Sequence, residues 1–570
     1  MKIVARDIPP RTAWALEQAG VHPLLARLYA ARGVQSKEEL DDGLARLLPP
    51  SGMKGIDAAA RLLADAMAQN KRLCIVADYD CDGATACAVG VRGLRLLGAQ
   101  NVDYLVPDRV ADGYGLTASI ARRVKERGAD VLITVDNGIA SVEGVAEAKA
   151  LGLQVLVTDH HLPGPALPAA DAIVNPNQPG CTFESKSMAG VGVMFYVLLA
   201  LRAELRARGV FDAATQPKLD PLLTLVALGT VADVVKLDAN NRRLVAQGLR
   251  RIRAGQMPAG MAALFHAAGR KAAAATTFDF GFALGPRINA AGRLADMTLG
   301  IECLLTDDAS RAAELAATLD GINRERREIE GGMREQAMLM AESLFDESEE
   351  PPPAISVFDP DFHEGVVGIV ASRIKDKLHR PTFVFAASSA PGKEHELKGS
   401  GRSIPGFHLR DALDLVAKRH PGLILKFGGH AMAAGLSIMA QQLEAFQTAF
   451  EHTVRELVCA DDLAQTYLTD GSLSAADITL AQAQHLAMQV WGQGFAPPSF
   501  TDEFAVIRQQ AMGVNHKKVW LQKEGCEFEA MFWRCTDEIP ERIRTVYRPV
   551  ANEWRNNIEL QLYIDYWEAA

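Results

Sequence analysis

Short apolar segments that alternate with helical patterns constrain the fold of this chain more than any other feature. Three runs rich in β-branched residues, 73–77, 131–135 and 155–158, are separated by stretches in which apolar residues recur with helical period. Buried strands that alternate with helices are typical of βαβ units, which build a parallel sheet with helices on both faces. The sequence therefore predicts an α/β domain with a parallel, doubly wound sheet.

The rest of the chain predicts further units around this domain. Residues 309–345 combine heptad-like apolar positions with many charges and contain no proline, which favours one long helix that ends at the acidic, proline-closed segment 346–353. A second α/β unit is expected after it, and short alternating strands beyond Asp461 indicate a small β-barrel. The expected division is a helical support segment at 1–50, the first α/β domain at 51–250, a helical region with the long connecting helix at 251–350, the smaller α/β domain at 351–455 and the barrel at 460–570.

Acidic side chains follow the first predicted strand at alternating positions. Asp78, Asp80 and Asp82 share one short turn that ends at Gly83. Close pairs of such charges repel by up to a few kcal/mol at an effective dielectric constant of about 20, so the crowding indicates a bound cation. An EF-hand calcium loop begins with the same pattern, but it requires a glutamate at the position that Val89 occupies here and a preceding helix rather than a strand. A solvated acidic turn without a function is the other alternative.

Polar groups also follow the second and third predicted strands. Asp136 comes directly after the second strand, and Asp159, His160 and His161 come directly after the third. Taken alone, Asp136 would fit a helix N-cap and His160 a surface histidine. Because ligands of parallel α/β sheets collect at the carboxyl ends of the strands, repetition at three strand ends favours one shared site.

The composition of this set predicts its chemistry. Asp233 adds a further carboxylate at the end of an apolar helix expected at 221–231, where an unpaired charge would be costly. Oxygen ligands with one or two imidazoles and no thiolate suit Mg²⁺ or Mn²⁺ better than Zn²⁺, and there are enough carboxylates for two ions. Two such ions activate water and stabilise the leaving oxygen of a phosphate displacement. The residues therefore predict phosphoester hydrolysis.

The order of these motifs resembles that of a known superfamily. The segments DYDCDG from Asp78, DNG from Asp136 and DHH from Asp159, followed by Asp233, occur in the order found in the DHH phosphoesterases. Four further motifs narrow the resemblance to the RecJ family of single-strand-specific DNA exonucleases: GPRINAAGR from Gly285, HEGVVG from His363, GSGRS from Gly399 and GGHAMAAG from Gly428. The resemblance covers the chain from about residue 24 to its end. It implies a DHH domain and a DHHA1 domain that are joined by a long helix and face each other across the active site, followed by an OB-fold.

Residue roles carry over from the family through the matching motifs. The resemblance implies that two Mn²⁺ or Mg²⁺ ions are held by Asp80, Asp82, Asp136, His160 and Asp233, with Asp78 beside them as a further ligand or acting through a water. It implies catalytic roles for Asp80 and Asp136, for Asp159, which would orient the imidazoles, and for His161, which would face the scissile phosphate. Tyr79, Cys81 and Lys236 stand where Phe, Ala and Pro are frequent in relatives, and none of them is a ligand.

Arginines in glycine-rich segments are candidates for holding the strand. The backbone can approach a phosphate closely there, and a guanidinium binds phosphate bidentately, although a surface salt bridge is the alternative for any single arginine. With the resemblance, Arg402 and Ser400 are expected to clamp a 5′-phosphate, with Arg109 and Arg287 as partners. The remaining substrate-binding candidates are Asn289, Arg293, His363, Ser403 and His430.

The barrel carries Trp520 and Trp533 beside basic residues. OB-folds use that combination to stack bases and follow a phosphate backbone, while core packing is the alternative role of each tryptophan.

The net charge and the cysteine pattern bear on the partners and the cellular compartment of the protein. The net charge of −10, from 70 acidic and 60 basic residues, by itself argues against a nucleic-acid partner. Six of the acids belong to the expected site, where two divalent ions would change −6 to −2, so metal and arginine can supply local positive potential. Eight cysteines without a CxxC pair, and a start that lacks a leader pattern, indicate a reduced, cytoplasmic protein. No apolar run is long enough for a membrane span.

The resemblance implies a monomeric 5′→3′ exonuclease that acts on single-stranded DNA, releases 5′-mononucleotides and works in recombination and repair beside a RecQ-type helicase and single-strand-binding protein. Two alternatives remain. One is another DHH hydrolase that acts on pyrophosphate, cyclic dinucleotides or very short RNAs, against which the barrel argues. The other is a non-catalytic scaffold with decayed ligands, which the complete ligand set disfavours.

Overall fold

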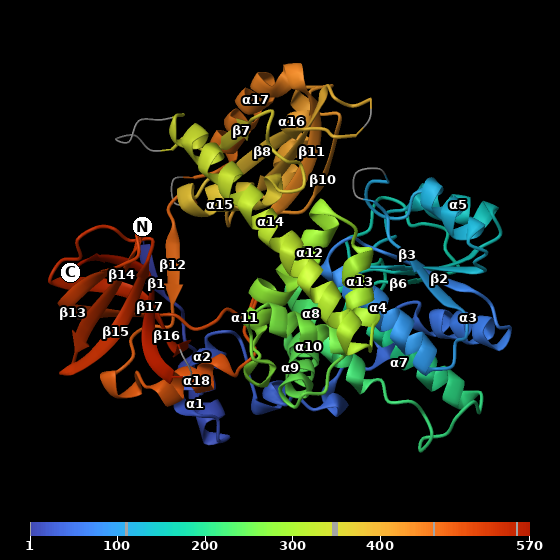
Figure 1. Cartoon of the computed structure of the whole chain (residues 1–570), viewed down its shortest axis with the longest axis horizontal. Helices are drawn as coiled ribbons and strands as arrows, with labels where there is room; N and C mark the ends of the chain where they lie inside the picture. The colour runs from blue at the N-terminus through green and yellow to red at the C-terminus, as the bar shows by residue number, and fades with distance from the viewer. Residues whose placement is uncertain (1, 109–111, 345–350, 391, 460–461, 555–556) are drawn as a thin grey trace.

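A five-stranded parallel sheet organises the N-terminal half of the molecule (Figure 1). The computed structural model describes residues 2–108, 112–344, 351–390, 392–459, 462–554 and 557–570. The strands follow the order β3 (Val102–Leu105), β2 (Leu73–Ala77), β4 (Val131–Val135), β5 (Gln154–Thr158) and β6 (Ala172–Val174). The three predicted strands are the central ones, and every residue of β2 and β4 is buried. The edge strands β3 and β6 were not predicted.

Helices cover both faces of this sheet. Alternate side chains of β2 point to opposite sides, so Ile75 packs in one hydrophobic cluster and Val76 in another. The first cluster includes residues of α3 (Ile56–Ala68), α4 (Cys81–Leu96) and α7 (Gly190–Ala207), and the second includes residues of α5 (Ala118–Glu126) and α6 (Val142–Ala150). The predicted doubly wound arrangement is confirmed.

A group of helices connects this sheet to the rest of the molecule. It consists of α8 (Leu223–Ala232), α9 (Ala239–Arg253), α10 (Ala259–Ala267), α11 (Thr277–Asp279), α12 (Gly285–Leu294) and α13 (Thr298–Leu305). The predicted connecting helix is α14 (Ala309–Glu342), whose 34 residues extend over about 50 Å. The Asp308 side chain accepts a hydrogen bond from the Arg311 N–H and caps its start.

A second sheet lies at the far end of α14. Its order is β10 (Lys426–Gly429), β11 (Ala433–Met439), β9 (Glu396–Arg402), β8 (Thr382–Ala387) and β7 (Ile355–Phe358). Only β7 and β8 are parallel; the other pairs are antiparallel. The helices of this unit are α15 (Val367–Leu378), α16 (Leu409–Arg419) and α17 (Leu443–Leu457). The smaller α/β unit is thus present as predicted.

The C-terminal part is a closed five-stranded barrel, which confirms the predicted barrel. Its strands are β13 (Phe500–Met512), β14 (His516–Lys523), β15 (Cys526–Trp533), β16 (Arg542–Trp554) and β17 (Asn557–Ala569), and α18 (Leu480–Ala487) precedes them. Figure 1 shows the barrel and the first α/β domain at opposite ends of the long axis, with the second sheet above α14 between them.

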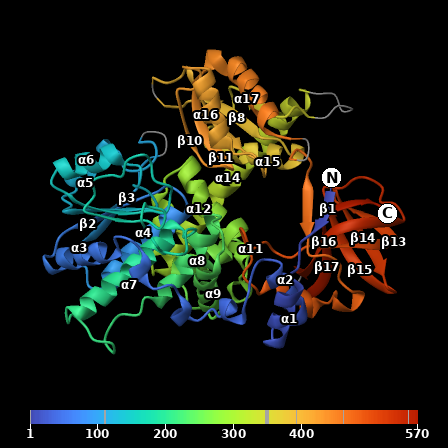
Figure 2. The same cartoon turned by 180° about the vertical axis from the view of Figure 1, so that it is seen from behind.

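The sequence predicts a helical segment at 1–50, and this prediction is wrong in part, because the segment also contains a strand. It contains α1 (Pro10–Gln18) and α2 (Pro23–Ala30), but it begins with β1 (Lys2–Ala5), which pairs in parallel with β12 (Thr466–Thr469). Seen from behind, β1 and β12 again lie side by side next to the barrel (Figure 2).

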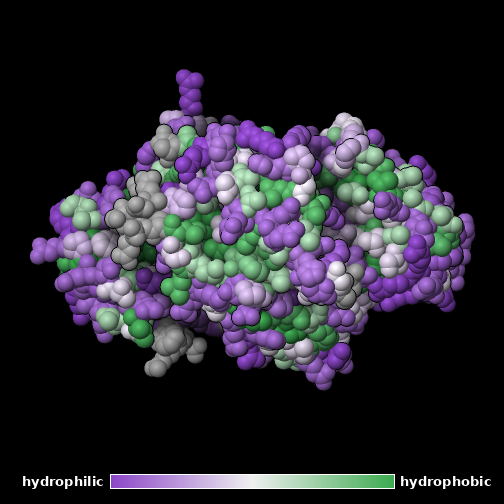
Figure 3. Space-filling view, turned by 90° about the horizontal axis from the view of Figure 1, so that it is seen from above, coloured by the Kyte–Doolittle hydropathy of each residue, from purple (hydrophilic) through white to green (hydrophobic). Residues whose placement is uncertain are grey.

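The described helices include none that is long and apolar enough to cross a membrane. Seen from above, hydrophilic residues predominate on the surface and hydrophobic ones are interspersed among them (Figure 3).

Candidate metal centre

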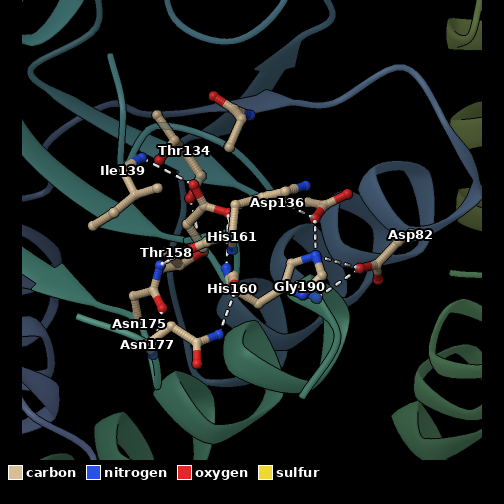
Figure 4. Close-up of polar contacts among 12 residues, drawn as sticks. Asp82, Thr134, Asp136, Ile139, Thr158, His160, His161, Asn175, Asn177 and Gly190 are labelled. Carbon is tan, nitrogen blue, oxygen red and sulfur yellow. Dashed lines mark hydrogen bonds and ion pairs between the residues drawn. The ribbon is translucent and has the colours of Figure 1, made fainter. Parts of the chain in front are cut away.

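The loops after β2, β4 and β5 bring acids and histidines together at one edge of the parallel sheet (Figure 4). Potential ligand atoms lie within 4.8 Å of one another in three overlapping groups. These groups are Asp136 with His160 and His161, Asp82 with His160 and Asp233, and Asp78 with Asp80 and Asp136. All six predicted metal ligands therefore meet in one place, and Asp136 and His160 each belong to two groups.

The centre of the site is the pair formed by His160 and Asp136. The His160 Nε2 atom lies 3.0 Å from Asp136 Oδ1, 3.4 Å from Asp233 Oδ2 and 3.9 Å from Asp82 Oδ2. Within the described part of the chain, His160 Nε2 and Asp136 Oδ1 are both buried and have no hydrogen-bond partner. Buried polar atoms nearly always have one, so a neutral imidazole nitrogen and a carboxylate oxygen left unsatisfied together fit a bound divalent cation.

Burial and mutual repulsion disfavour the charged forms of these acids and of His160 when no cation is bound. Burial, followed by repulsion from Asp82 and Asp80, raises the pKa of Asp136 and of Asp233 well above the usual value. Burial and the charge of Asp80 raise the pKa of Asp82 to about 7. Burial and the neighbouring His161 lower the pKa of His160 to about 3, so its imidazole is neutral and able to coordinate metal.

Local backbone geometry fixes these ligands. The Asp80 carboxylate caps α4 by accepting a hydrogen bond from the Gly83 N–H at 2.9 Å. Asp136 adopts a left-handed conformation with a φ of 61°, which is uncommon for a residue other than glycine. A Cβ atom on Gly190, at the start of α7, would lie 2.6 Å from the Asp136 Cβ, so this position requires glycine. Asp82 accepts hydrogen bonds from the N–H groups of Gly190 and Val191 at 2.6 and 2.9 Å.

Asp159 holds His161 in a charged state. The Asp159 carboxylate accepts hydrogen bonds from the Ile139 N–H at 2.9 Å, from the His160 N–H and from His161 Nδ1, the last two at 2.7 Å. Burial opposes the protonation of His161, but the hydrogen bond and charge of Asp159 outweigh it and raise the His161 pKa to about 9. At neutral pH the metal-free site thus contains an imidazolium that can donate to a phosphate oxygen.

Three residues of the site were not predicted from the sequence. The Tyr114 hydroxyl lies 3.3 Å from His161 Nε2. Asn175 Nδ2 donates to the His161 carbonyl at 2.9 Å, and Asn177 Nδ2 donates to the His160 carbonyl at 2.6 Å, so both asparagines fix the backbone of the histidine pair (Figure 4). They follow β6, and a signal existed: they are polar residues at another strand end. Nothing in the sequence around Tyr114 marks it.

Helix α12 connects the site to the interior of the molecule. The Asn289 Oδ1 atom accepts a hydrogen bond from the Cys81 N–H at 2.7 Å, so this predicted substrate residue supports the start of α4, where Asp80 is the N-cap and Asp82 lies in the first turn. Arg293 donates to the Gly365 carbonyl at 3.0 Å.

Two of the predicted substrate residues have their polar groups engaged by other parts of the protein. Arg287 forms an ion pair with Asp320 at 2.8 Å and donates to the Ala283 carbonyl at 2.7 Å, so its guanidinium has partners within the helical region. The Ser403 hydroxyl is buried and donates to the Phe407 carbonyl at 2.6 Å.

The second sheet contributes a cationic position near the metal centre. Arg402 Nη1 donates to Ser400 Oγ at 3.1 Å, and a Cβ atom on Gly368, at the start of α15, would lie 2.8 Å from Arg402 Nη2. Burial lowers the pKa of Arg402, and no acid of the described chain forms an ion pair with it.

Two more candidates lie on this sheet unit, and a third is not described. The His430 ring stacks on His161 with 6.4 Å between ring centroids, and His363 Nδ1 accepts from the Gly365 N–H at 3.1 Å. Arg109 lies outside the described residues.

Metal removal is expected to lower stability in a pH-dependent way. Because folding raises the pKa of Asp82 to about 7 and that of His161 to about 9, proton binding favours the folded, metal-free protein, and this contribution is lost as pH rises through those values. We expect the melting temperature of dialysed, metal-free protein to fall by several degrees between pH 6.5 and 8. Folding lowers the pKa of His160, so His160 reduces the stability of the folded protein as pH falls. This effect is confined to pH values below about 6.5, the ordinary pKa of histidine, and does not act between pH 6.5 and 8.

Differential scanning fluorimetry with and without Mn²⁺ measures this difference. The metal-loaded protein should show a much smaller decline over the same interval. Parallel declines in the two forms would contradict the prediction.

The chain matches known families along most of its length. Residues 72–230 match the DHH family, N-terminal domain, residues 352–456 match the DHHA1 domain and residues 469–566 match the RecJ OB domain. Single-stranded-DNA-specific exonuclease RecJ of Haemophilus influenzae is 47% identical, and that of Escherichia coli 46% identical, each over 96% of this chain and 96% of the relative. The crystal structure of Thermus thermophilus RecJ in complex with Mn²⁺ superposes with a TM-score of 0.82 and 30% identity, covering all of this chain and 79% of that one. A Mg²⁺ complex of the same protein gives a TM-score of 0.77.

Proposed function

Because the chain belongs to the RecJ family of single-stranded-DNA-specific exonucleases, we propose that it degrades single-stranded DNA from the 5′ end and releases 5′-mononucleotides. The observation that carries the proposal is the buried pair of His160 Nε2 and Asp136 Oδ1, unsatisfied within the described residues and surrounded by further carboxylates. A site of this kind is suited to divalent metal and to phosphodiester hydrolysis.

We propose that the ligand set holds two Mn²⁺ or Mg²⁺ ions, the metals named for the Thermus thermophilus structures. Asp136 and His160 belong to two ligand groups each, so they would hold the ions close together, while Asp78, Asp80, Asp82 and Asp233 complete the groups. When bound, the ions would activate a water and stabilise the leaving oxygen. His161, oriented by its hydrogen bond to Asp159, would face a non-bridging oxygen of the scissile phosphate.

The position of Arg402 supports attack at a 5′ end. Arg402 pairs in register with Ala433, whose carbonyl accepts from the His430 N–H at 2.8 Å, and the His430 ring stacks on His161. A terminal phosphate bound by Arg402, Ser400 and the start of α15 would therefore lie next to the metal centre, because guanidinium groups and helix N-termini both favour phosphate. Hydrolysis of the next phosphodiester would then release one nucleotide.

The polarity is tested with long single-stranded oligonucleotides that are blocked at one end and supplied with Mn²⁺ or Mg²⁺. We expect a 5′ block to stop degradation and a 3′ block to leave the initial rate unchanged, because only the 5′ end must enter the clamp. Degradation that continues with a 5′ block and stops with a 3′ block would overturn the polarity. Faster turnover of a dinucleotide than of a long strand would favour the alternative hydrolase acting on very short substrates.

We also propose that the enzyme is a monomer that acts in recombination and repair after a RecQ-type helicase has exposed a strand that single-strand-binding protein then covers. The reason is chemical: a site that takes one strand end needs that strand to be separated from its complement. A blunt duplex should resist degradation until such a helicase and ATP are added.

A further inference from the structure

Two phenylalanines on the helical region are exposed and stacked on each other. Phe278 of α11 is 50% exposed and Phe282 is 65% exposed, and their ring centroids lie 4.6 Å apart with an interplanar angle of 22°. Phe282 belongs to a π-helical turn, Phe280–Leu284, that leads directly into α12. Large exposed apolar side chains are common singly, but an aligned pair that leaves its outer faces in water is typical of a surface that binds something.

One cation lies beside this ring pair, and a second links the same segment to the barrel. The Arg270 guanidinium lies 5.9 Å from the centre of the Phe278 ring and pairs with Asp279 at 3.5 Å, and Lys271 pairs with Glu553 of β16. The ion pair between Lys271 and Glu553 places this segment against the barrel. In both views α11 lies on the side of the central helices that faces the barrel (Figures 1 and 2).

We propose that Phe278 and Phe282 form a base-stacking platform that holds the single strand between the metal centre and the barrel. The inference rests on the proposed function. Aromatic faces beside cations are what a single strand requires, because every base has a π-face to stack and every nucleotide a phosphate to neutralise. An apolar protein segment would use the rings but not the adjacent Arg270 guanidinium.

The platform is connected to the metal centre through α12. This helix begins directly after the π-helical turn, and its Asn289 contacts the start of α4, which carries Asp80 and Asp82. Asn289 lies seven positions after Phe282, a distance of about 10 Å along a helix. A strand clamped at its 5′ end would therefore reach the rings after a few nucleotides and then continue towards the barrel.

The test compares long and short substrates in variants of the full-length protein with Mn²⁺. We expect the double variant Phe278→Ala/Phe282→Ala to raise KM for a long single strand by roughly tenfold to 100-fold. Its kcat on a short 5′-phosphorylated oligonucleotide that ends before the rings should be unchanged. Phe278→Leu/Phe282→Leu, which keeps apolar area without a π-face, should resemble the alanine variant, and Phe282→Trp should keep the wild-type KM. Trp14→Ala, at an exposed aromatic residue on α1 that is 64% exposed, is the matched control and should change nothing.

Each outcome decides the inference. An unchanged KM for long strands in the double alanine variant, or a leucine variant as good as wild type, would overturn the platform while leaving the nuclease intact. If the wild-type protein degraded no DNA, the proposed function would fail instead. Fluorescence anisotropy with a labelled strand would then still test the platform, with weaker binding by the alanine variant expected and equal binding overturning it.

Discussion

Replacing Asp136 with asparagine is expected to reduce strand degradation by at least about 1000-fold. Asp136 belongs to two of the three ligand groups, so its loss weakens the binding of both proposed ions. The metal ions contribute several kcal/mol to stabilising the transition state, and each 1.36 kcal/mol corresponds to about tenfold in rate. Asparagine is the informative replacement because it tolerates the left-handed backbone that Asp136 adopts, whereas alanine would add backbone strain.

The same substitution should have the opposite effect on the stability of the metal-free protein. Burial and neighbouring carboxylates disfavour the charge of Asp136, so removing that charge should raise the melting temperature after dialysis against a chelator. A residue with a purely structural role would lose activity and stability together. Asp57→Asn, at an exposed acid in the first turn of α3, is the control and should leave both quantities near wild type. Turnover by Asp136→Asn within tenfold of wild type would refute the assigned role.

Local sequence predicts the centre of the site well because the ligands are attached to buried parallel strands. Such strands are apolar on both faces, so β2, β4 and β5 stand out as continuous apolar runs, and the residue after each run must lie at the same edge of the sheet. The order Asp78, Asp136, Asp159 then determines which side chains meet. The distances between the ligand atoms depend on backbone details, such as the left-handed conformation of Asp136, which the pattern of apolar residues does not indicate.

Elements that depend on distant partners were not predictable in the same way. The strand β1 has only four residues and forms because β12, more than 460 residues later, pairs with it. The edge strands β3 and β6 are short, and β16 contains Pro549 among charged residues, so none of them has a clear alternating pattern. Asn175 and Asn177 follow β6 directly, so they are recognisable as strand-end residues only when β6 itself is predicted.

Side-chain roles in the glycine-rich motifs were predicted only in part, because a motif does not show which charge a side chain will meet. Arg287 and Arg402 both lie in glycine-rich segments and are equally suited to phosphate on sequence grounds. Folding places Asp320 of α14 beside Arg287, while no acid of the described chain pairs with Arg402. A partly buried guanidinium without a carboxylate is the stronger candidate for an external anion, because removing an unpaired charge from water is costly unless a ligand compensates.

Replacing Arg402 with alanine is therefore expected to remove most of the preference for a 5′-phosphate. Hydrogen bonds to charged groups contribute about 1.5–3 kcal/mol, so KM for a 5′-phosphorylated strand should rise roughly tenfold to 150-fold. The same variant should have a nearly unchanged KM for a strand with a 5′-hydroxyl, because that end makes no such contact. Arg402→Lys keeps the charge but loses the bidentate geometry, so it should recover only part of the preference.

A matched control separates this effect from a general loss of positive charge. Lys398 lies on β9 on the same face as Ser400 and Arg402, but it already pairs with Glu396 at 3.6 Å. Lys398→Ala should keep the full preference for the phosphorylated end, whereas Ser400→Ala, which removes the hydroxyl that orients Arg402, should lose part of it. If Arg402→Ala and Lys398→Ala weakened the two kinds of strand end equally, Arg402 would act as a general cation and the clamp would have to lie elsewhere. The comparison of phosphorylated with hydroxyl ends thus tests the position of the clamp independently of the metal centre.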